Sequence, residues 1–318
     1  MSAMTDHLWG IILAGGEGRR LQPFIRSHLG SGRPKQYCAL LGTRSMLRHT
    51  IARAERLIPP ERLLTVVTRH HLPYAREELH DRPSSTVIVQ PSNRDTGPGI
   101  LLPLLHVYRR NPEAMVALLP SDHFICEEDR FMAAVDAAAA CVAACPERPI
   151  LLGVEPDRLE IEYGWIEAGE VIGRYQGREL HQVRRFWEKP DPQTANDLYL
   201  NGCLWNTMVL IGQAGALLKL FATLTPALFV ALSQIRSSLD RAEEARALEE
   251  VYRSLPPINF SQEILTRGSH HLGVIRVQGI YWNDWGNPEQ VRRDIARFGA
   301  RRPSQPLPEW EGSLSAVS

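Results

Sequence analysis

A run of glycines followed by cations near the start of the chain has the composition of a phosphate-binding loop. Residues 13–21 read Leu-Ala-Gly-Gly-Glu-Gly-Arg-Arg-Leu, and residues 33–36 read Arg-Pro-Lys-Gln. Glycines let backbone N–H groups approach a phosphate closely, and cations balance its charge. A triphosphate would suit the glycines and cations here, which are Gly15, Gly16, Gly18, Arg19, Arg20 and Lys35. The alternative interpretation is a tight turn with solvated charges.

The spacing of these glycines differs from two common nucleotide-binding patterns. It matches neither G-x-G-x-x-G nor the Walker pattern G-x-x-x-x-G-K-[ST]. The chain also lacks an acidic residue suitably placed after a second predicted strand, which an NAD site would use for the ribose. The sequence therefore disfavours both an NAD-dependent oxidoreductase and a P-loop NTPase.

Two carboxylates stand where a divalent cation could be held. Asp122 follows the apolar run 115–119 in Pro-Ser-Asp, and Asp284 lies in Trp-Asn-Asp-Trp. Two carboxylates that converge would bind Mg²⁺, which keeps several waters and bridges phosphate oxygens. Spacing alone does not show that they converge. Taken separately, Asp122 could cap a helix and Asp284 could accept a hydrogen bond in a turn.

Other polar side chains could recognise a base or a sugar phosphate. Gln90 follows the apolar run 87–89, and its amide could pair with the donors and acceptors of a base edge. Glu188 could accept hydrogen bonds from sugar hydroxyls, and Lys189 could hold a phosphate as a point charge. The alternatives are a polar residue that starts a loop, for Gln90, and an exposed ion pair for the other two.

The elements that must position these residues alternate between strands and helices in the first half of the chain. Short apolar runs that end at turn residues predict strands at 8–13, 63–68, 87–89 and 115–119. Helical patterns predict helices at 45–57, 71–79, 97–109 and 129–144. This alternation predicts an α/β fold, with a mostly parallel sheet flanked by helices. Ligands then bind beyond the carboxyl ends of the strands, where the unusual residues stand.

The second half is less regular, and we expect it to continue the same α/β domain over residues 1–300. Strands are predicted at 150–154, 164–167, 183–188, 205–211 and 273–277. Helices are predicted at 214–221, 226–237 and 242–252. Residues 301–318 are rich in Pro and Ser and are expected to form a mobile tail.

The overall composition narrows the class of protein. The 318 residues have a formal net charge of zero, which gives no support for binding to nucleic acid or to an anionic membrane. We find neither the pattern of a signal peptide nor an uncharged apolar window of about 18 residues that could span a membrane. The five cysteines lack C-x-x-C spacing, so we expect buried thiols and a reducing, cytoplasmic setting.

The glycine-rich segment resembles the signature L-A-G-G-x-G-T-R-L, followed by P-K, of the sugar-phosphate nucleotidyltransferase family. Further motifs resemble the mannose-1-phosphate guanylyltransferase branch of that family, and they occur in the family's order over roughly residues 8–290. They are QPSNRDTGP at 90–98, LPSDH at 119–123, YGWI at 163–166, WEKP at 187–190, WNT at 205–207 and WNDWG at 282–286.

The resemblance implies a Rossmann-like, glycosyltransferase-A-like fold, with nucleotide bound by the first half and sugar phosphate by the second. It implies transfer of a nucleotidyl group from GTP to mannose 1-phosphate, which gives GDP-mannose and pyrophosphate. Mg²⁺ is the implied cofactor, with Asp122 and Asp284 as ligands. Catalytic roles are implied for Arg20, Lys35 and Asp122. The implied nucleotide-binding residues are Gly15, Gly16, Gly18, Arg19, Gln90, Arg94 and Thr96. The implied sugar-phosphate-binding residues are Tyr163, Gly164, Glu188, Lys189 and Asn206.

The chain departs from the family's pattern at three places. Arg19 replaces a threonine, Met208 replaces the glycine of W-N-S-G-M-F, and T-G-Y-G-Y-I begins here with Ile161 and Glu162. The alternatives are therefore the same chemistry with another sugar 1-phosphate or base, or a catalytically silent paralogue that binds a sugar nucleotide and regulates a partner. α/β enzymes of this size often self-associate, so a homodimer is one expectation for this chain.

Overall fold

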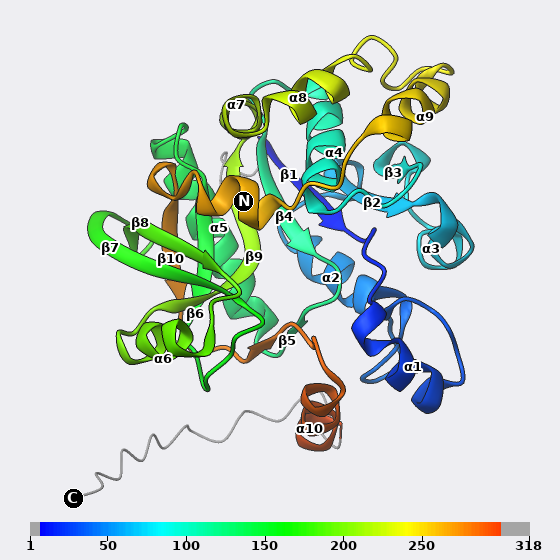
Figure 1. The fold of residues 1–318 in the computed structure, drawn as a ribbon. Helices are drawn as coiled ribbons and strands as arrows, with labels where there is room; N and C mark the ends of the chain where they lie inside the picture. The colour runs from blue at the N-terminus through cyan, green and yellow to red at the C-terminus, as the bar shows by residue number, and fades with distance from the viewer. Residues whose placement is uncertain (1–6, 300–318) are drawn as a thin grey trace, which may run out of the picture.

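A nine-stranded mixed sheet forms the centre of the molecule (Figure 1). The fold is that of a computed structural model, in which residues 7–299 are described; the predicted tail at 301–318 lies outside the described residues. The strand order is β3-β2-β1-β4-β9-β6-β10-β8-β7. The strands are β1 (Leu8–Leu13), β2 (Leu63–Thr68), β3 (Val87–Gln90), β4 (Met115–Pro120), β6 (Ile150–Val154), β7 (Gly164–Tyr175), β8 (Arg178–Glu188), β9 (Leu204–Gln213) and β10 (Gly273–Val277).

The first four strands of the large sheet are mutually parallel, and the strands beyond them are mixed. β1 pairs in parallel with both β2 and β4, and β2 pairs in parallel with β3. β9 runs antiparallel between β4 and β6, and β7 and β8 form an antiparallel pair. The chain thus winds outward from β1 to β3 and then returns to the other side of β1 as β4. A sheet that reverses its winding in this way leaves a crevice at the carboxyl ends of the two central strands.

Helices cover both faces of the sheet, as predicted for the α/β class (Figure 1). α4, α7 and α8 contact one another on one face, while α2 and α5 contact each other on the other. The helices are α1 (Gln22–Leu29), α2 (Met46–Ala54), α3 (Leu72–Glu78), α4 (Thr96–Arg110), α5 (Glu128–Ala144), α6 (Pro192–Leu200), α7 (Ala214–Leu224), α8 (Pro226–Ser233), α9 (Glu244–Ser254) and α10 (Pro288–Phe298).

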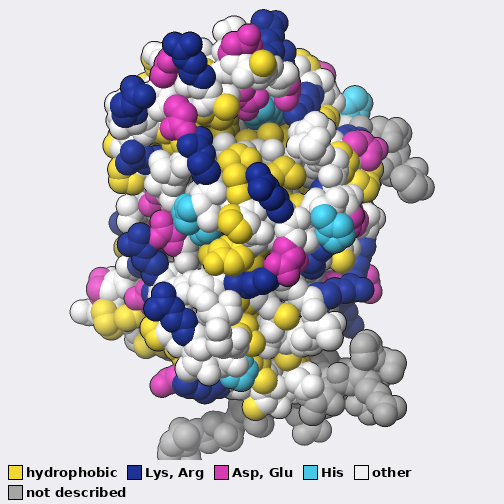
Figure 2. All heavy atoms as spheres, turned by 90° about the vertical axis from the view of Figure 1, so that its right-hand side faces the viewer, with side chains coloured by type: hydrophobic (Ala, Val, Ile, Leu, Met, Phe, Trp, Pro, Cys, Tyr) yellow, Lys and Arg dark blue, Asp and Glu magenta, His cyan; other side chains and the backbone are white. Residues whose placement is uncertain are grey.

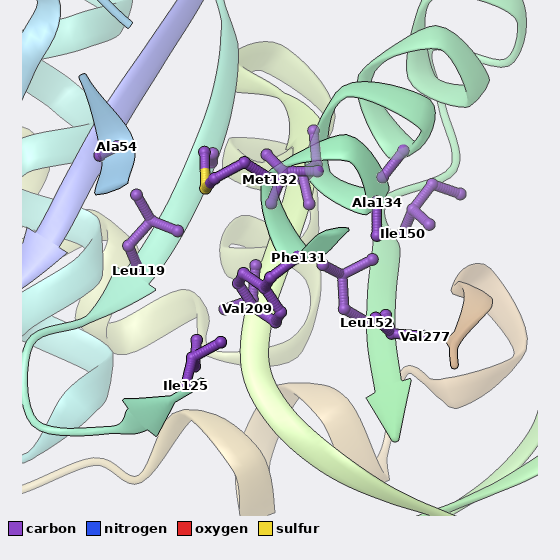
Figure 3. Close-up of a cluster of buried hydrophobic side chains, with 14 of the residues drawn as sticks. Ala54, Leu119, Ile125, Phe131, Met132, Ala134, Ile150, Leu152, Val209 and Val277 are labelled. Atoms are coloured by element: carbon purple, nitrogen blue, oxygen red, sulfur yellow. The ribbon is translucent and has the colours of Figure 1, made fainter. Parts of the chain in front are cut away.

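Two hydrophobic cores hold the helices against the sheet. Successive residues of a strand point to opposite faces, so β1 places Ile11 in the core under α4 and Ile12 in the core under α2 and α5. Figure 3 shows the second of these cores, where Phe131 and Met132 of α5 lie against side chains of several strands, among them Leu119 and Leu152. β2, β4 and β6 are buried along their whole length, so both of their faces are covered, which is why short apolar runs identified them.

Several elements differ from the sequence predictions. The strand expected at 164–167 extends to Tyr175 and pairs with β8 as a long hairpin. The added residues escaped prediction because none of them is buried and glycines and charged residues interrupt the apolar ones. Helices α1, α6 and α10 were not predicted, nor was the short pair β5 (Phe124–Ile125) and β11 (Trp282–Asn283). α10 carries a recognisable start signal, since the side chain of Asn287 caps it and Pro288 is its first residue.

The cysteine prediction is correct for three of the five thiols. Cys38, Cys141 and Cys203 are buried, whereas Cys126 and Cys145 are only partly buried. Burial raises the pKa of Cys38 and Cys203 to about 11 and that of Cys141 to about 12, so these three thiols stay protonated near neutral pH.

The face of the molecule shown in Figure 2 carries charges of both signs. Lys and Arg side chains are interspersed there with Asp and Glu side chains. That face therefore does not present a broad positive field. Within residues 7–299, no single helix is long and apolar enough to cross a membrane; the pair α7 and α8, bent by 120°, meets that length and composition only when both are taken together.

Candidate functional site

A cavity of about 920 Å³ opens at the carboxyl ends of β1 and β4, where the sheet topology predicts a ligand site. Ten of the predicted site residues line it, namely Gly15, Gly16, Gly18, Arg19, Arg20, Lys35, Gln90, Thr96, Asp122 and Asp284. Arg94 and the five predicted sugar-phosphate residues do not line it. The cavity therefore corresponds to the predicted nucleotide and metal side of the site.

The backbone of the glycine-rich loop is fixed by a side chain that the sequence analysis did not identify. Gln36, which is buried, donates hydrogen bonds from Nε2 to the carbonyls of Ala14 (2.9 Å) and Gly16 (2.8 Å). Gly18 has φ +59°, and a Cβ there would lie 3.3 Å from the backbone of Lys35. A larger residue at 18 would be strained and crowded, so glycine is needed to keep the loop against the Lys35 segment.

Lys35 connects the two predicted metal ligands. Its side chain is only 6% exposed, and Nζ lies 2.9 Å from Oδ2 of Asp122. The same ammonium donates to the backbone carbonyls of Asp284 and Trp285. The loop after β4 and the turn before α10 therefore meet at one cation, which contacts the carboxylate of Asp122 and the backbone carbonyl of Asp284. Convergence of the two carboxylates stays a prediction.

The Asp122 carboxylate is held ionised and has one oxygen that Lys35 does not engage. Burial would raise the pKa of this carboxyl, but the Lys35 ammonium, His123 and a backbone hydrogen bond together outweigh burial, and the pKa lies below its ordinary value. The other oxygen, Oδ1, lies 3.8 Å from Nε2 of His123, beyond hydrogen-bond distance. Burial lowers the pKa of His123, which favours a neutral imidazole packed edge-on against Trp282. This agrees with a structural role for His123.

Asp284 combines a structural contact with a place on the cavity wall. Its Oδ1 accepts a hydrogen bond from the backbone N–H of Gly286 at 2.8 Å, which is the turn contact considered as an alternative role. Asp284 also lines the cavity, together with Asp122. The turn contact engages one of its two carboxylate oxygens.

Gln90 is oriented by a tyrosine from a distant helix. Tyr252 of α9, fully buried, donates from its hydroxyl to Oε1 of Gln90 at 3.0 Å. The Nε2 of Gln90 points toward the glycine loop, where a Cβ on Gly15 would lie 3.1 Å from it. With its oxygen engaged, the amide can offer N–H donors to a base whose edge carries acceptors. Tyr252 is thus a positioning residue that had no sequence signal of its own.

Removing the Tyr252 hydroxyl should weaken recognition of the nucleotide base. We expect Tyr252→Phe to reduce kcat/KM for the preferred nucleoside triphosphate about fivefold, because the lost hydrogen bond costs about 1 kcal/mol. Discrimination against other bases should fall with it, while KM for the sugar phosphate stays unchanged. Steady-state kinetics with each nucleotide test this expectation. Unaltered base preference in a folded variant would show that Gln90 does not need Tyr252.

Two further predicted nucleotide-binding residues, Arg94 and Thr96, have structural contacts. Arg94 donates from Nη2 to the backbone carbonyl of Tyr252 at 3.0 Å, so it supports α9 from outside the cavity. Thr96 begins α4 and accepts a hydrogen bond at Oγ1 from the backbone N–H of Phe260 at 2.8 Å. Thr96 lines the cavity and Arg94 does not.

The predicted sugar-phosphate residues lie side by side at one end of the β7–β8 hairpin. Gly164 pairs with Glu188 in the hairpin, and the backbone N–H of Lys189 donates to the carbonyl of Tyr163 at 3.2 Å. A Cβ on Gly164 would lie 3.2 Å from Oε2 of Glu188 and 3.3 Å from Cβ of Asn206. The fold therefore brings these five residues together, next to rather than within the cavity.

Several of these side chains are already engaged within the protein. Tyr163 is buried, donates to Oδ1 of Asn283 (3.0 Å) and accepts from Arg158 (3.1 Å). Asn206 is buried and accepts at Oδ1 from the backbone N–H of Met208 (3.1 Å). Burial raises the pKa of Glu188. Tyr163 therefore ties the YGWI motif to the WNDWG motif rather than presenting its hydroxyl to a ligand.

Backbone strain concentrates in the same motifs. Six non-glycine residues of the described chain have positive φ, and four of them, Asp95, Lys189, Met208 and Trp285, belong to segments predicted to form the site. Left-handed backbone at such residues costs free energy and persists where the surrounding structure imposes it, often at functional sites. The left-handed positions thus coincide with segments that the sequence predicts to form the site.

Comparison with known proteins agrees with this geometry. Residues 9–297 match the family model for nucleotidyl transferases. A mannose-1-phosphate guanylyltransferase of Escherichia coli (strain K12) is 29% identical over 286 residues, covering 88% of this chain and 58% of that protein. The xanthan biosynthesis protein XanB of Xanthomonas campestris pv. campestris (strain B100) is 31% identical over 289 residues, covering 89% and 58%. The chain thus spans somewhat more than half the length of these relatives.

A solved structure shares the fold. The structure described as mannose-1-phosphate geranyltransferase from Thermus thermophilus aligns with a TM-score of 0.77 and 27% identity, covering 94% of this chain and 81% of that chain. The predicted resemblance and the α/β fold class are both confirmed. From the match over most of its length, we conclude that this chain belongs to the nucleotidyl transferase family.

Proposed function

We propose that this chain transfers a nucleotidyl group from GTP to mannose 1-phosphate, which gives GDP-mannose and pyrophosphate. The observation that carries the proposal is the meeting of Lys35, Asp122 and the Asp284 turn at the cavity beyond β1 and β4. The names of the relatives supply the choice of guanine and mannose. The cytoplasmic location and the homodimer stay predictions.

The proposed reaction needs positioning and charge neutralisation more than proton transfer. An oxygen of the sugar 1-phosphate attacks the α-phosphorus of the nucleotide in line, and pyrophosphate leaves from the opposite side. Because a phosphate monoester is already an anion, it needs no strong general base. Lys35 and Arg20 would stabilise the charge on the triphosphate, and Lys189 would anchor the attacking phosphate.

The residues present fit a magnesium ion. Asp122 and Asp284 both line the cavity and would supply hard carboxylate oxygens, and one Asp122 oxygen is not engaged by Lys35. Bound there, Mg²⁺ would neutralise phosphate charge and orient the reacting groups. The carboxylates would hold the ion, while Lys35 keeps the loop after β4 and the Asp284 turn together.

One observation favours a second candidate, the same reaction on a sugar 1-phosphate other than mannose. Met208 adopts φ +59° where the family has glycine, and its sulfur accepts a hydrogen bond from the Ser261 hydroxyl at 3.3 Å. The side chain thus adds bulk beside Asn206 on the predicted sugar side. We expect Met208→Gly to broaden the range of sugar 1-phosphates used, with the nucleotide KM unchanged. Unaltered sugar preference would remove Met208 as a determinant.

The test of the proposed function is pyrophosphate release in the presence of Mg²⁺. GTP, ATP, UTP, CTP and dTTP would each be combined with mannose, glucose, galactose and fucose 1-phosphates. We expect the highest kcat/KM for GTP with mannose 1-phosphate. Preference for another pair would keep the reaction and change the product. Absence of turnover with every pair, from folded protein that still binds a sugar nucleotide, would contradict the enzyme and favour a regulatory role.

A further inference from the structure

Each cation predicted to bind phosphate already has a carboxylate partner in the described chain. Arg19 pairs with Glu17, and Lys35 pairs with Asp122. Arg20 and Lys189 instead share one partner, Glu162, which stands where the family's T-G-Y-G-Y-I pattern has glycine. Asp122 and Glu17 line the cavity as part of the loops they belong to, but Glu162 comes from a separate segment.

Glu162 lies between the cation of the glycine loop and the cation of the WEKP motif. Its Oε2 is 2.8 Å from Nη1 of Arg20 and 3.7 Å from Nζ of Lys189. Arg20 belongs to the loop for the nucleotide, and Lys189 to the segment for the sugar phosphate. One carboxylate oxygen thus stands between the two groups whose proposed ligands must react with each other.

The Glu162 backbone is fixed, whereas its side chain can move. Its N–H donates to Oε1 of Glu160 at 3.1 Å, and the carbonyl of Glu160 accepts from the indole of the fully buried Trp165 at 2.8 Å. The side chains of Arg20, Glu162 and Lys189 are each about half exposed, at 56%, 52% and 49%. Exposed ion pairs contribute at most about 1 kcal/mol each, so the carboxylate can be displaced at modest cost.

We propose that the Glu162 carboxylate is a stand-in for phosphate, which neutralises Arg20 and Lys189 in the empty site and is displaced when the substrates bind. This inference depends on the proposed function in one respect, namely that Arg20 and Lys189 bind phosphate. A phosphate monoester, with more charge and more acceptor oxygens, outcompetes one carboxylate, whereas weaker anions do not. Glu162 is a positioning residue. An anion binds Arg20 and Lys189 only if it interacts with them strongly enough to displace the Glu162 carboxylate.

The test compares Glu162→Gln with the parent protein, using inorganic pyrophosphate as the probe in calorimetric titrations. The amide keeps the shape and removes the charge, so we expect pyrophosphate to bind about fivefold more tightly, and less so at high salt. In kinetics, KM for the sugar 1-phosphate should fall by a similar factor while kcat is unchanged, because ground and transition states gain equally. Glu179→Gln, which removes the exposed partner of Arg174 at the far end of the hairpin, is the matched control.

Three results would overturn the inference. Equal or weaker pyrophosphate binding by Glu162→Gln, or no binding to either protein, would show that Glu162 does not compete with phosphate. A raised KM for sugar 1-phosphate alone would indicate that Glu162 contacts a sugar hydroxyl. An equal gain in pyrophosphate affinity in Glu179→Gln would show that the effect comes from the change in net charge and not from the position of Glu162. Tighter pyrophosphate binding by a protein without turnover would instead support the inference and contradict the proposed function.

Discussion

Replacing Asp122 with asparagine is expected to lower kcat about 100- to 1,000-fold, the typical loss when a group that stabilises transition-state charge is removed. The carboxylate sits on the cavity wall, is ionised under the influence of Lys35, and has an oxygen available to a cation. The amide keeps the size of the side chain but cannot balance the Lys35 charge. Steady-state assays over a range of Mg²⁺ concentrations measure the effect, and the Mg²⁺ requirement should rise as well.

The control for Asp122→Asn is Asp129→Asn, since Asp129 is 95% exposed on α5 and pairs only with a surface arginine, Arg56, in the described contacts. Its kcat should match that of the parent protein. Thermal melts of both variants separate loss of chemistry from loss of fold. A kcat within about threefold of the parent for Asp122→Asn would contradict the role of this carboxylate in positioning charge at the reacting phosphates.

Replacing Asp294 with alanine is expected to cost about 3 kcal/mol of unfolding free energy, because it leaves buried donors without an acceptor. Asp294 of α10 is fully buried and accepts hydrogen bonds from three side chains, those of Tyr281 (2.6 Å), Asn283 (3.0 Å) and Trp285 (2.8 Å). All three belong to the segment that carries Asp284. Urea unfolding measures the free energy, and activity should also fall because the turn loses its support.

Two further variants separate the causes of this effect. Asp294→Asn keeps the shape and one acceptor oxygen for Asn283 and Trp285 but loses the charge and the acceptor for Tyr281, so we expect a stability between the parent and the alanine variant. Glu289→Ala removes an exposed carboxylate from the same helix and should change stability by about a few tenths of a kcal/mol. If Asp294→Ala cost no more than Glu289→Ala, the buried network would not be what holds the Asp284 turn.

The sequence predicted the central strands well and the peripheral elements poorly. β1, β2, β6 and β10 begin and end where the apolar runs predicted, because strands covered on both faces consist mostly of apolar residues. The β7–β8 hairpin was longer than expected, because its exposed residues carry no apolar run. Likewise α10 packs through a few buried side chains, Val291 and Phe298 among them, on an otherwise polar helix.

The sequence likewise predicted the place of some candidate site residues and not of others. The glycine loop, Lys35, Asp122 and Asp284 do lie on one cavity, since loops at the carboxyl ends of neighbouring strands meet at one edge of the sheet. The predicted sugar-phosphate residues gather at the adjoining hairpin instead. Their roles, like the magnesium ion, stay predictions that the proposed experiments address.

The sequence by itself determined the fold class, the family and the residue types available for chemistry. Strand periodicity, turn residues and motifs each depend on residues that are close together along the chain. Only the tertiary structure decided the pairings: Tyr252 with Gln90, Glu162 with Arg20 and Lys189, and Asp294 with the Asp284 turn. The partners Tyr252 and Gln90 are 162 residues apart, and Glu162 and Arg20 are 142 apart. Hydrogen bonds and ion pairs depend on distance in space, which for such partners is set by strand order and winding and not by spacing along the chain.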